Sequence, residues 1–140
     1  TTFLDALGGD VDAMLAARAL QLLLPGTPQL YYVGLLMGRN DEALLARTGV
    51  GRDVNRHHYT EEEVATALSE AAVVRLLALV ELRRTHPAFD GEWWLAPADP
   101  DAPGVIVTGW RGADDRTVTL RLDVVERRAT LEVDGRQQEV

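Results

Sequence analysis

The stretch PGTPQLYYVG, residues 25–34, decides how the fold of this chain is interpreted. Pro25 and Pro28 prevent a helix from continuing through it. The apolar run that follows, residues 29–33, does not alternate between polar and apolar side chains. Such a run is typical of a strand that is buried on both faces, as in a parallel sheet. We therefore predict a strand over residues 29–34.

The residues before this strand form an amphipathic pattern. Asp10 is a good N-cap, and apolar side chains recur at helical spacing from there to residue 24, which predicts a helix over residues 10–24. A helix, a short turn and a doubly buried strand make an αβ unit of a larger parallel sheet or barrel. No second run of this kind is present, and the chain begins at Thr1 instead of Met. We therefore expect a truncated N-terminus, with the neighbouring strands in a longer protein.

A long loop over residues 35–59 follows the predicted strand, with one short helix over residues 40–47. Loops that leave the carboxyl ends of strands in α/β barrels build active sites, and long loops in compact domains are usually functional. Thr60 and Glu63 then have the spacing of a capping box. They predict the start of a helix over residues 61–85, with a break near Ser69.

From Gly91 onward the helical spacing gives way to short β-runs, and Asp134-Gly135 is typical of a hairpin turn. The predicted strands cover residues 92–95, 105–111, 117–123 and 128–133. Alternation in the third run indicates an antiparallel sheet with one wet face. We therefore predict an α+β chain in two parts. Residues 1–90 contain the first helix, the strand, the long loop and the last helix, and residues 91–140 form a small antiparallel β-domain.

Composition excludes several classes of function. The chain is 46% hydrophobic and 26% charged, which indicates a globular protein. Its net charge of −8, from 22 Asp and Glu against 14 Lys and Arg, argues against nucleic acid as a partner. No apolar run is long enough to cross a membrane. There is no cysteine, which is compatible with a reducing cytoplasm, and we expect a cytoplasmic location.

Three motifs carry a family resemblance: PGTPQLYYVGLLMGRND (25–41), GRDVNRHHYTEEEV (51–64) and RRTHPAFDGEW (83–93). Together with the order helix, strand, loop, helix and β-domain, they resemble the end of sucrose phosphorylases in glycoside hydrolase family thirteen, the α-amylase superfamily. The motif over residues 51–59 is the specific part. The resemblance implies the last strand and helix of a TIM (β/α)8 barrel followed by a C-terminal β-domain.

The family reaction transfers a glucosyl unit from sucrose to phosphate with retention, which requires two carboxyl groups. The resemblance places these groups upstream of Thr1, so this chain carries no catalytic residue and is expected to be inactive alone. The implied partners of the longer protein are phosphate and sucrose or a related α-glucoside. Sucrose 6′-phosphate, glucosylglycerate and glucosylglycerol remain open as alternatives. No cofactor and no metal are implied.

The resemblance assigns Arg52 to the subsite that holds the donor glucose. A guanidinium offers a rigid fork of donors that suits a carboxylate and sugar hydroxyls together, and Gly51 before it allows a tight turn. Asn40, Asp41 and Asp53 are weaker candidates for the same site. A loop Asn-Asp pair more often caps a turn or a helix, and Asp53 looks more like a loop brace.

Two other hypotheses concern metal binding and a different class of function. His57 and His58 are adjacent, but no Cys, Asp or Glu lies at metal spacing beside them, so we expect no metal site. The chain could instead be a non-catalytic interaction module. It would then form homo-oligomers by pairing the strand over residues 29–34, because an exposed apolar strand is a template for association.

Overall fold

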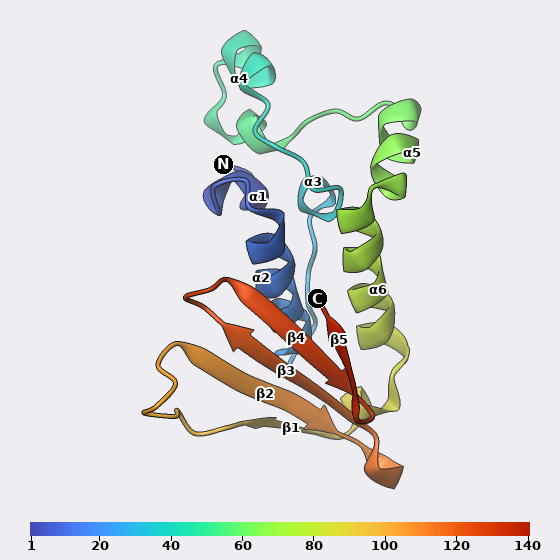
Figure 1. The fold of residues 1–140 in the computed structure, drawn as a ribbon. Coiled ribbons are helices and arrows are strands. Elements are labelled where there is room, and N and C mark those ends of the chain that lie inside the picture. Colours follow the sequence, from blue (N-terminus) through green and yellow to red (C-terminus); the bar gives the residue numbers. More distant parts are fainter.

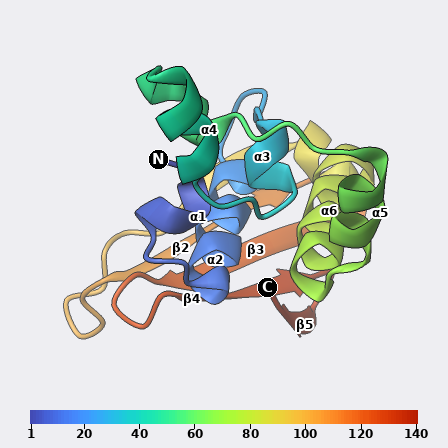
Figure 2. The ribbon, with the colours of Figure 1, turned by 90° about the horizontal axis from the view of Figure 1, so that it is seen from above.

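The computed structural model describes all residues, 1–140, and consists of one antiparallel sheet with helices over one of its faces (Figure 1). Viewed from above, α2 and α6 lie across the sheet, while α4 and α5 extend beyond it (Figure 2). The helices are α1 (Phe3–Ala6), α2 (Val11–Leu23), α3 (Tyr32–Leu35), α4 (Glu42–Thr48), α5 (Glu61–Ser69) and α6 (Ala71–Thr85), and the 3-10 turns are η1 (Gly51–Asn55), η2 (Pro87–Asp90) and η3 (Ala113–Asp115). None of these helices combines the length and the apolar character needed to cross a membrane.

The predicted helices are confirmed at their ends by the capping side chains. Asp10 Oδ1 accepts a hydrogen bond from the backbone N–H of Ala13 at 3.0 Å, which fixes the start of α2. Both bonds of the predicted capping box are present at the start of α5, between Thr60 and Glu63. The predicted break near Ser69 is at Glu70, whose ψ of 134° separates α5 from α6.

The sheet has five strands in the order β1-β2-β3-β4-β5, and every neighbouring pair is antiparallel. The strands are β1 (Glu92–Leu95), β2 (Val105–Arg111), β3 (Thr117–Asp123), β4 (Arg128–Val133) and β5 (Arg136–Glu139). The first four match the predicted runs. The turn at Asp134-Gly135 joins β4 to β5, and both of its residues have positive φ, as a tight hairpin requires. Strand β5 is not among the predicted runs.

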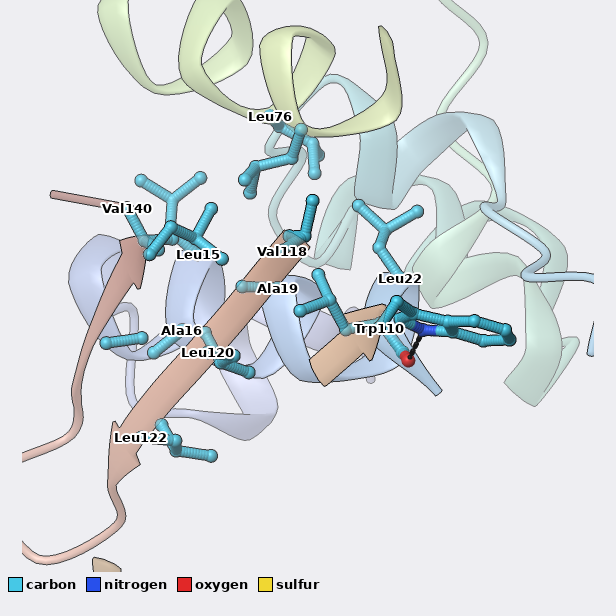
Figure 3. Packing of buried hydrophobic residues seen from close by; sticks show 14 of the residues in the cluster. Leu15, Ala16, Ala19, Leu22, Leu76, Trp110, Val118, Leu120, Leu122 and Val140 are labelled. Atoms are coloured by element: carbon cyan, nitrogen blue, oxygen red, sulfur yellow. Dashed lines mark hydrogen bonds between the residues drawn. The ribbon is translucent and has the colours of Figure 1, made fainter. Parts of the chain in front are cut away.

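The core lies between α2, α6 and the inner face of the sheet. Fifteen buried residues form one cluster there, which includes Leu131. Figure 3 shows Leu15, Leu76 and Leu120 of this cluster. Alternation along β3 places Val118, Leu120 and Leu122 in this cluster and leaves the intervening side chains on the outer face. Full burial of each leucine contributes about 1.5–3 kcal/mol to stability. The helices and the sheet therefore share one core.

Trp110 on β2 fastens the sheet to the end of α2. Its indole Nε1–H donates a buried hydrogen bond to the carbonyl oxygen of Leu23 at 2.6 Å (Figure 3). The ring of Phe89 lies 5.8 Å away, and the guanidinium of Arg83 lies over both aromatic rings. These contacts hold the C-terminal end of α2, the turn after α6 and the sheet together.

The predicted strand over residues 29–34 is wrong for this structure. Tyr31 has extended backbone angles, but α3 begins at Tyr32, and the five strands of the sheet lie elsewhere. The side chains of Tyr31 and Tyr32 are 49% and 40% exposed, so the segment is not buried on both faces. A strand needs a neighbour for its backbone hydrogen bonds. An apolar run without such a neighbour closes its hydrogen bonds locally, as a helical turn.

Candidate functional site

Arg52 lies in the short 3-10 helix η1, in the loop between α4 and α5. Its side chain is exposed, and no hydrogen bond or ion pair of the chain engages the guanidinium. Gly51 begins the 3-10 turn η1, and the left-handed position of this loop is at Gly49, which ends α4 with a φ of 67°. Arg52 thus presents all of its donors to solvent.

The segment that carries Arg52 is braced by Asp41. The backbone N–H of Asp41 donates to the carbonyl oxygen of Val54 at 2.7 Å, which ties the start of α4 to η1. The Asp41 carboxylate accepts the N–H of Leu44 at 2.7 Å and so caps α4. The same carboxylate lies 2.7 Å from His57 Nδ1. Asp41 therefore holds both ends of the loop over residues 41–57.

The other two candidates have different surroundings. Asn40 Oδ1 accepts the backbone N–H of Thr2 at 2.7 Å, and its own N–H donates to Asp5 Oδ2 at 2.6 Å. Asn40 therefore attaches the loop to the region of α1. Asp53 is half-buried in η1, and its backbone carbonyl accepts the N–H of Arg56. Of the four predicted site residues, Asp41 contacts η1 directly, Asp53 and Arg52 belong to η1, and Asn40 points its amide toward the N-terminal residues.

His57 is the residue that sequence reasoning missed as a partner of Asp41. Its Nδ1 faces Asp41 Oδ2, its Nε2 lies 3.3 Å from Glu63 Oε1, and the Tyr59 ring packs edge-on with centroids 4.6 Å apart. The hydrogen bond to Asp41, followed by the interactions with Glu63, raises the pKa of His57 above its ordinary value. The hydrogen bond with His57 is also the largest cause that lowers the pKa of Asp41, whereas the pKa of Glu63 is lowered first by its hydrogen bonds with Thr60 and then by His57.

Asp41, His57 and Tyr59 border an open hollow of about 480 Å³. The other residues that line it are Arg39, Asn40, Glu42 and Ala43. Carboxylate and imidazole groups at this rim are suited to hydrogen bonding with hydroxyl groups. No group of three or more His, Cys, Asp or Glu side chains in the chain is arranged to hold a metal ion. The hollow is therefore a polar surface that can accept a hydroxylated ligand.

Comparisons with known proteins find similar sequences of one kind. A sucrose phosphorylase of Agrobacterium vitis is 50% identical over 109 residues, which cover 78% of this chain and 22% of that protein. A glucosylglycerol phosphorylase of Marinobacter adhaerens is 46% identical over 81% of this chain and 23% of its own length. A sucrose 6(F)-phosphate phosphorylase of Thermoanaerobacterium thermosaccharolyticum is 39% identical over 94% of this chain and 26% of its own length. No protein-family model matches.

The fold is also that of a solved structure. The crystal structure of a sucrose 6F-phosphate phosphorylase from Thermoanaerobacter thermosaccharolyticum matches 99% of this chain with a TM-score of 0.88 and 37% sequence identity, and the match covers 28% of that chain. The helices and the antiparallel sheet thus recur together in that protein. The chain spans about a quarter of the length of the curated relatives that it matches.

Proposed function

Because this chain is homologous to the C-terminal region of sucrose phosphorylases, we propose that it works as part of a longer, retaining phosphorylase of glycoside hydrolase family thirteen. The substrates would be phosphate and sucrose or a related α-glucoside. The observation that carries this proposal is the match of almost the whole chain to one end of a phosphorylase, in fold and in sequence together. Residues 1–90 would complete the catalytic barrel, and residues 91–140 would form its C-terminal β-domain.

Within this enzyme we assign Arg52 to the subsite of the donor glucose. An exposed guanidinium without a partner in the chain, on a loop segment tied down by Asp41, supports the assignment. A bidentate guanidinium would orient the glucosyl unit through its hydroxyl groups, and such positioning lowers the barrier to transfer. Asn40, Asp41 and Asp53 would then support the loop that presents Arg52.

The chemistry itself would come from the rest of the longer protein. A retaining mechanism uses one carboxyl group as nucleophile and a second as acid and base, about 5–5.5 Å apart. We expect both outside these residues, so the chain alone should not form glucose 1-phosphate. The relatives are named for sucrose, sucrose 6(F)-phosphate, glucosylglycerol and glucosylglycerate, and the choice among such substrates is open. A cytoplasmic location also remains a prediction.

The alternative, an interaction module that forms homo-oligomers through residues 29–34, is not favoured by the structure. That proposal depends on a free strand edge in this segment, and residues 32–35 form the helical turn α3 instead. The side chains of Tyr31 and Tyr32 are exposed there, but the backbone does not present the row of unpaired N–H and C=O groups that the edge of a strand would offer.

The assignment of Arg52 is tested by substitution in the longer enzyme. We expect Arg52→Lys to lower kcat/KM about tenfold or more, because lysine keeps the charge but loses the bidentate fork. The matched control is Arg47→Lys, at an exposed arginine of the neighbouring helix α4. Unchanged kcat/KM in Arg52→Lys would remove Arg52 from the site. Phosphorolysis by the 140-residue chain alone would contradict the proposal that the catalytic carboxyl groups lie outside these residues.

A further inference from the structure

Arg18 is a buried cation without a counter-ion. It lies on α2, and only 6% of the residue is exposed. None of the ion pairs in the chain includes it. Arginine is almost never buried unless it is paired, because removing a charge from water is costly. The position therefore requires a partner that these 140 residues do not supply.

The hydrogen bonds of Arg18 are also incomplete. Nη1 donates to Gln21 Oε1 at 2.6 Å, while Gln21 Nε2 donates to the carbonyl oxygen of Gln29 at 2.9 Å. The Phe3 ring covers one face of the guanidinium at 4.1 Å. Nε is buried without any partner, and no hydrogen bond engages Nη2. The free donors are thus Nε and Nη2, which lie along one edge of the guanidinium.

Arg18 also lines a pocket with polar and apolar walls. Its volume is about 330 Å³, and Arg18 lines it together with Thr1, Gln29, Tyr31 and Asn55 among others. Gly34 also lines it, and a Cβ at this glycine would lie 2.5 Å from Arg18 Nη2. The absence of a side chain at Gly34 therefore leaves the space that the guanidinium occupies.

We propose that Arg18 and this pocket form a binding site for an oxyanion, a carboxylate or a phosphate group, which the unpartnered Nη2 would hold. Charge-assisted hydrogen bonds from a guanidinium to a carboxylate or a phosphate are shorter and stronger than hydrogen bonds between neutral groups. Gln29 and Asn55 provide further amide groups at the pocket wall. The oxyanion can come from a free anion or from an Asp or Glu side chain of a longer chain. The site does not depend on the role of Arg52.

The test follows the Nε–Hε resonance of Arg18 by NMR in the 140-residue chain. Sodium formate and inorganic phosphate are titrated separately, with chloride as the reference at constant ionic strength, because the net charge of −8 makes nonspecific salt effects large. We expect a saturable shift with at least one of the two anions and none with chloride. Arg18→Met should weaken anion-dependent thermal stabilisation about tenfold or more in apparent affinity. The matched control Arg47→Met should retain it.

The source of the oxyanion is distinguished by repeating the titration in the longer phosphorylase. If free anions still shift the resonance there, the ligand is a free anion. If the resonance is already shifted and free anions do not change it, the ligand is a carboxylate of the protein. Either result supports the site. A wild-type 140-residue chain whose Arg18 resonance responds to neither anion would overturn the proposal, as would equal losses in Arg18→Met and Arg47→Met.

Discussion

Two regions of the molecule are stabilised in different ways. The helix-and-sheet core, made of α2, α6 and the five strands, contains thirteen of the fifteen clustered apolar residues. Of the other two, Ala88 lies in the turn between α6 and β1, and Val140 follows β5. The outer segment, residues 24–69, contributes none of the fifteen and packs against the cluster only through Leu35 and Met37. It extends away from the sheet in Figure 1. Directional contacts hold it instead, such as those of Asp41 with Val54 and His57.

Because of this difference, the stability of the fold and the geometry of the candidate site depend on different kinds of interaction. Burial of apolar surface is non-directional and does not titrate, so the core tolerates changes of pH and of surface charge. Hydrogen bonds and ion pairs fix geometry, but each contributes little when it is exposed. Arg52 lies in the outer segment, so its position depends on such hydrogen bonds and ion pairs. The site geometry is therefore more sensitive to single substitutions and to pH than the fold.

The largest effect is expected for truncation within the core. Leu120 on β3 is fully buried, so Leu120→Ala should lower the free energy of unfolding by about 2–5 kcal/mol, through lost burial and the cavity that remains. The measurement is chemical denaturation followed by circular dichroism. Leu95→Ala on β1, at a side chain that is 55% exposed, is the control and should cost less than about 0.5 kcal/mol. Equal losses in the free energy of unfolding in both variants would mean that the buried face of the sheet does not contribute the stabilising core.

A smaller and local effect is expected in the outer segment. Thr60→Ala removes the oxygen that caps α5, a helix without buried residues. The lost cap is worth about 1 kcal/mol, so hydrogen exchange of the α5 amides should accelerate about fivefold, while amides of β3 should not change. The matched control is Thr66→Ala, inside the same helix. Equal acceleration in α5 and β3 would show that the two regions unfold together.

The smallest effect is a pH dependence that originates at His57. Its pKa is raised in the folded chain, so its contribution is fully present below the unfolded value of about 6.5 and is lost as pH rises through the folded pKa. Asp41 and Glu63 have lowered pKa values, so their contributions are lost only as pH falls through the acid range. Between about pH 6 and pH 9 the stability advantage of wild type over His57→Gln should therefore shrink. Denaturation midpoints across this range measure it, with His58→Gln as control. A stability difference between wild type and His57→Gln that stays constant over this pH range would contradict the ion pairs assigned to His57.

The parts of the fold that depend on local patterns were predictable. Asp10 and Thr60 mark the starts of α2 and α5 by their own side chains, and alternation along β3 assigns its two faces. These signals are contained within a few residues, so tertiary context does not alter them. The family resemblance was likewise carried by contiguous motifs, and the matches to phosphorylases confirm it.

The parts that depend on distant partners were not predictable. The run Leu30 to Val33 has the composition of a strand, but only a neighbouring strand would make it one. Strand β5 is polar and exposed along its whole length, so it shows no apolar pattern and is defined by its pairing with β4. The contact of His57 with Asp41 joins residues sixteen positions apart across a loop. The unpaired state of Arg18 is invisible in a sequence that simply places it on a helix.

The packing of α2 has a consequence for dissecting the molecule. This helix contacts α6 on one side and β2, β3 and β4 on the other. A gene cut after codon 90 would yield a complete sheet, yet one whose dry face, with Val118, Leu120 and Leu131, is bare to water. The boundary near residue 90, where helices give way to strands, is thus not a position at which the chain can be divided into two units that fold independently.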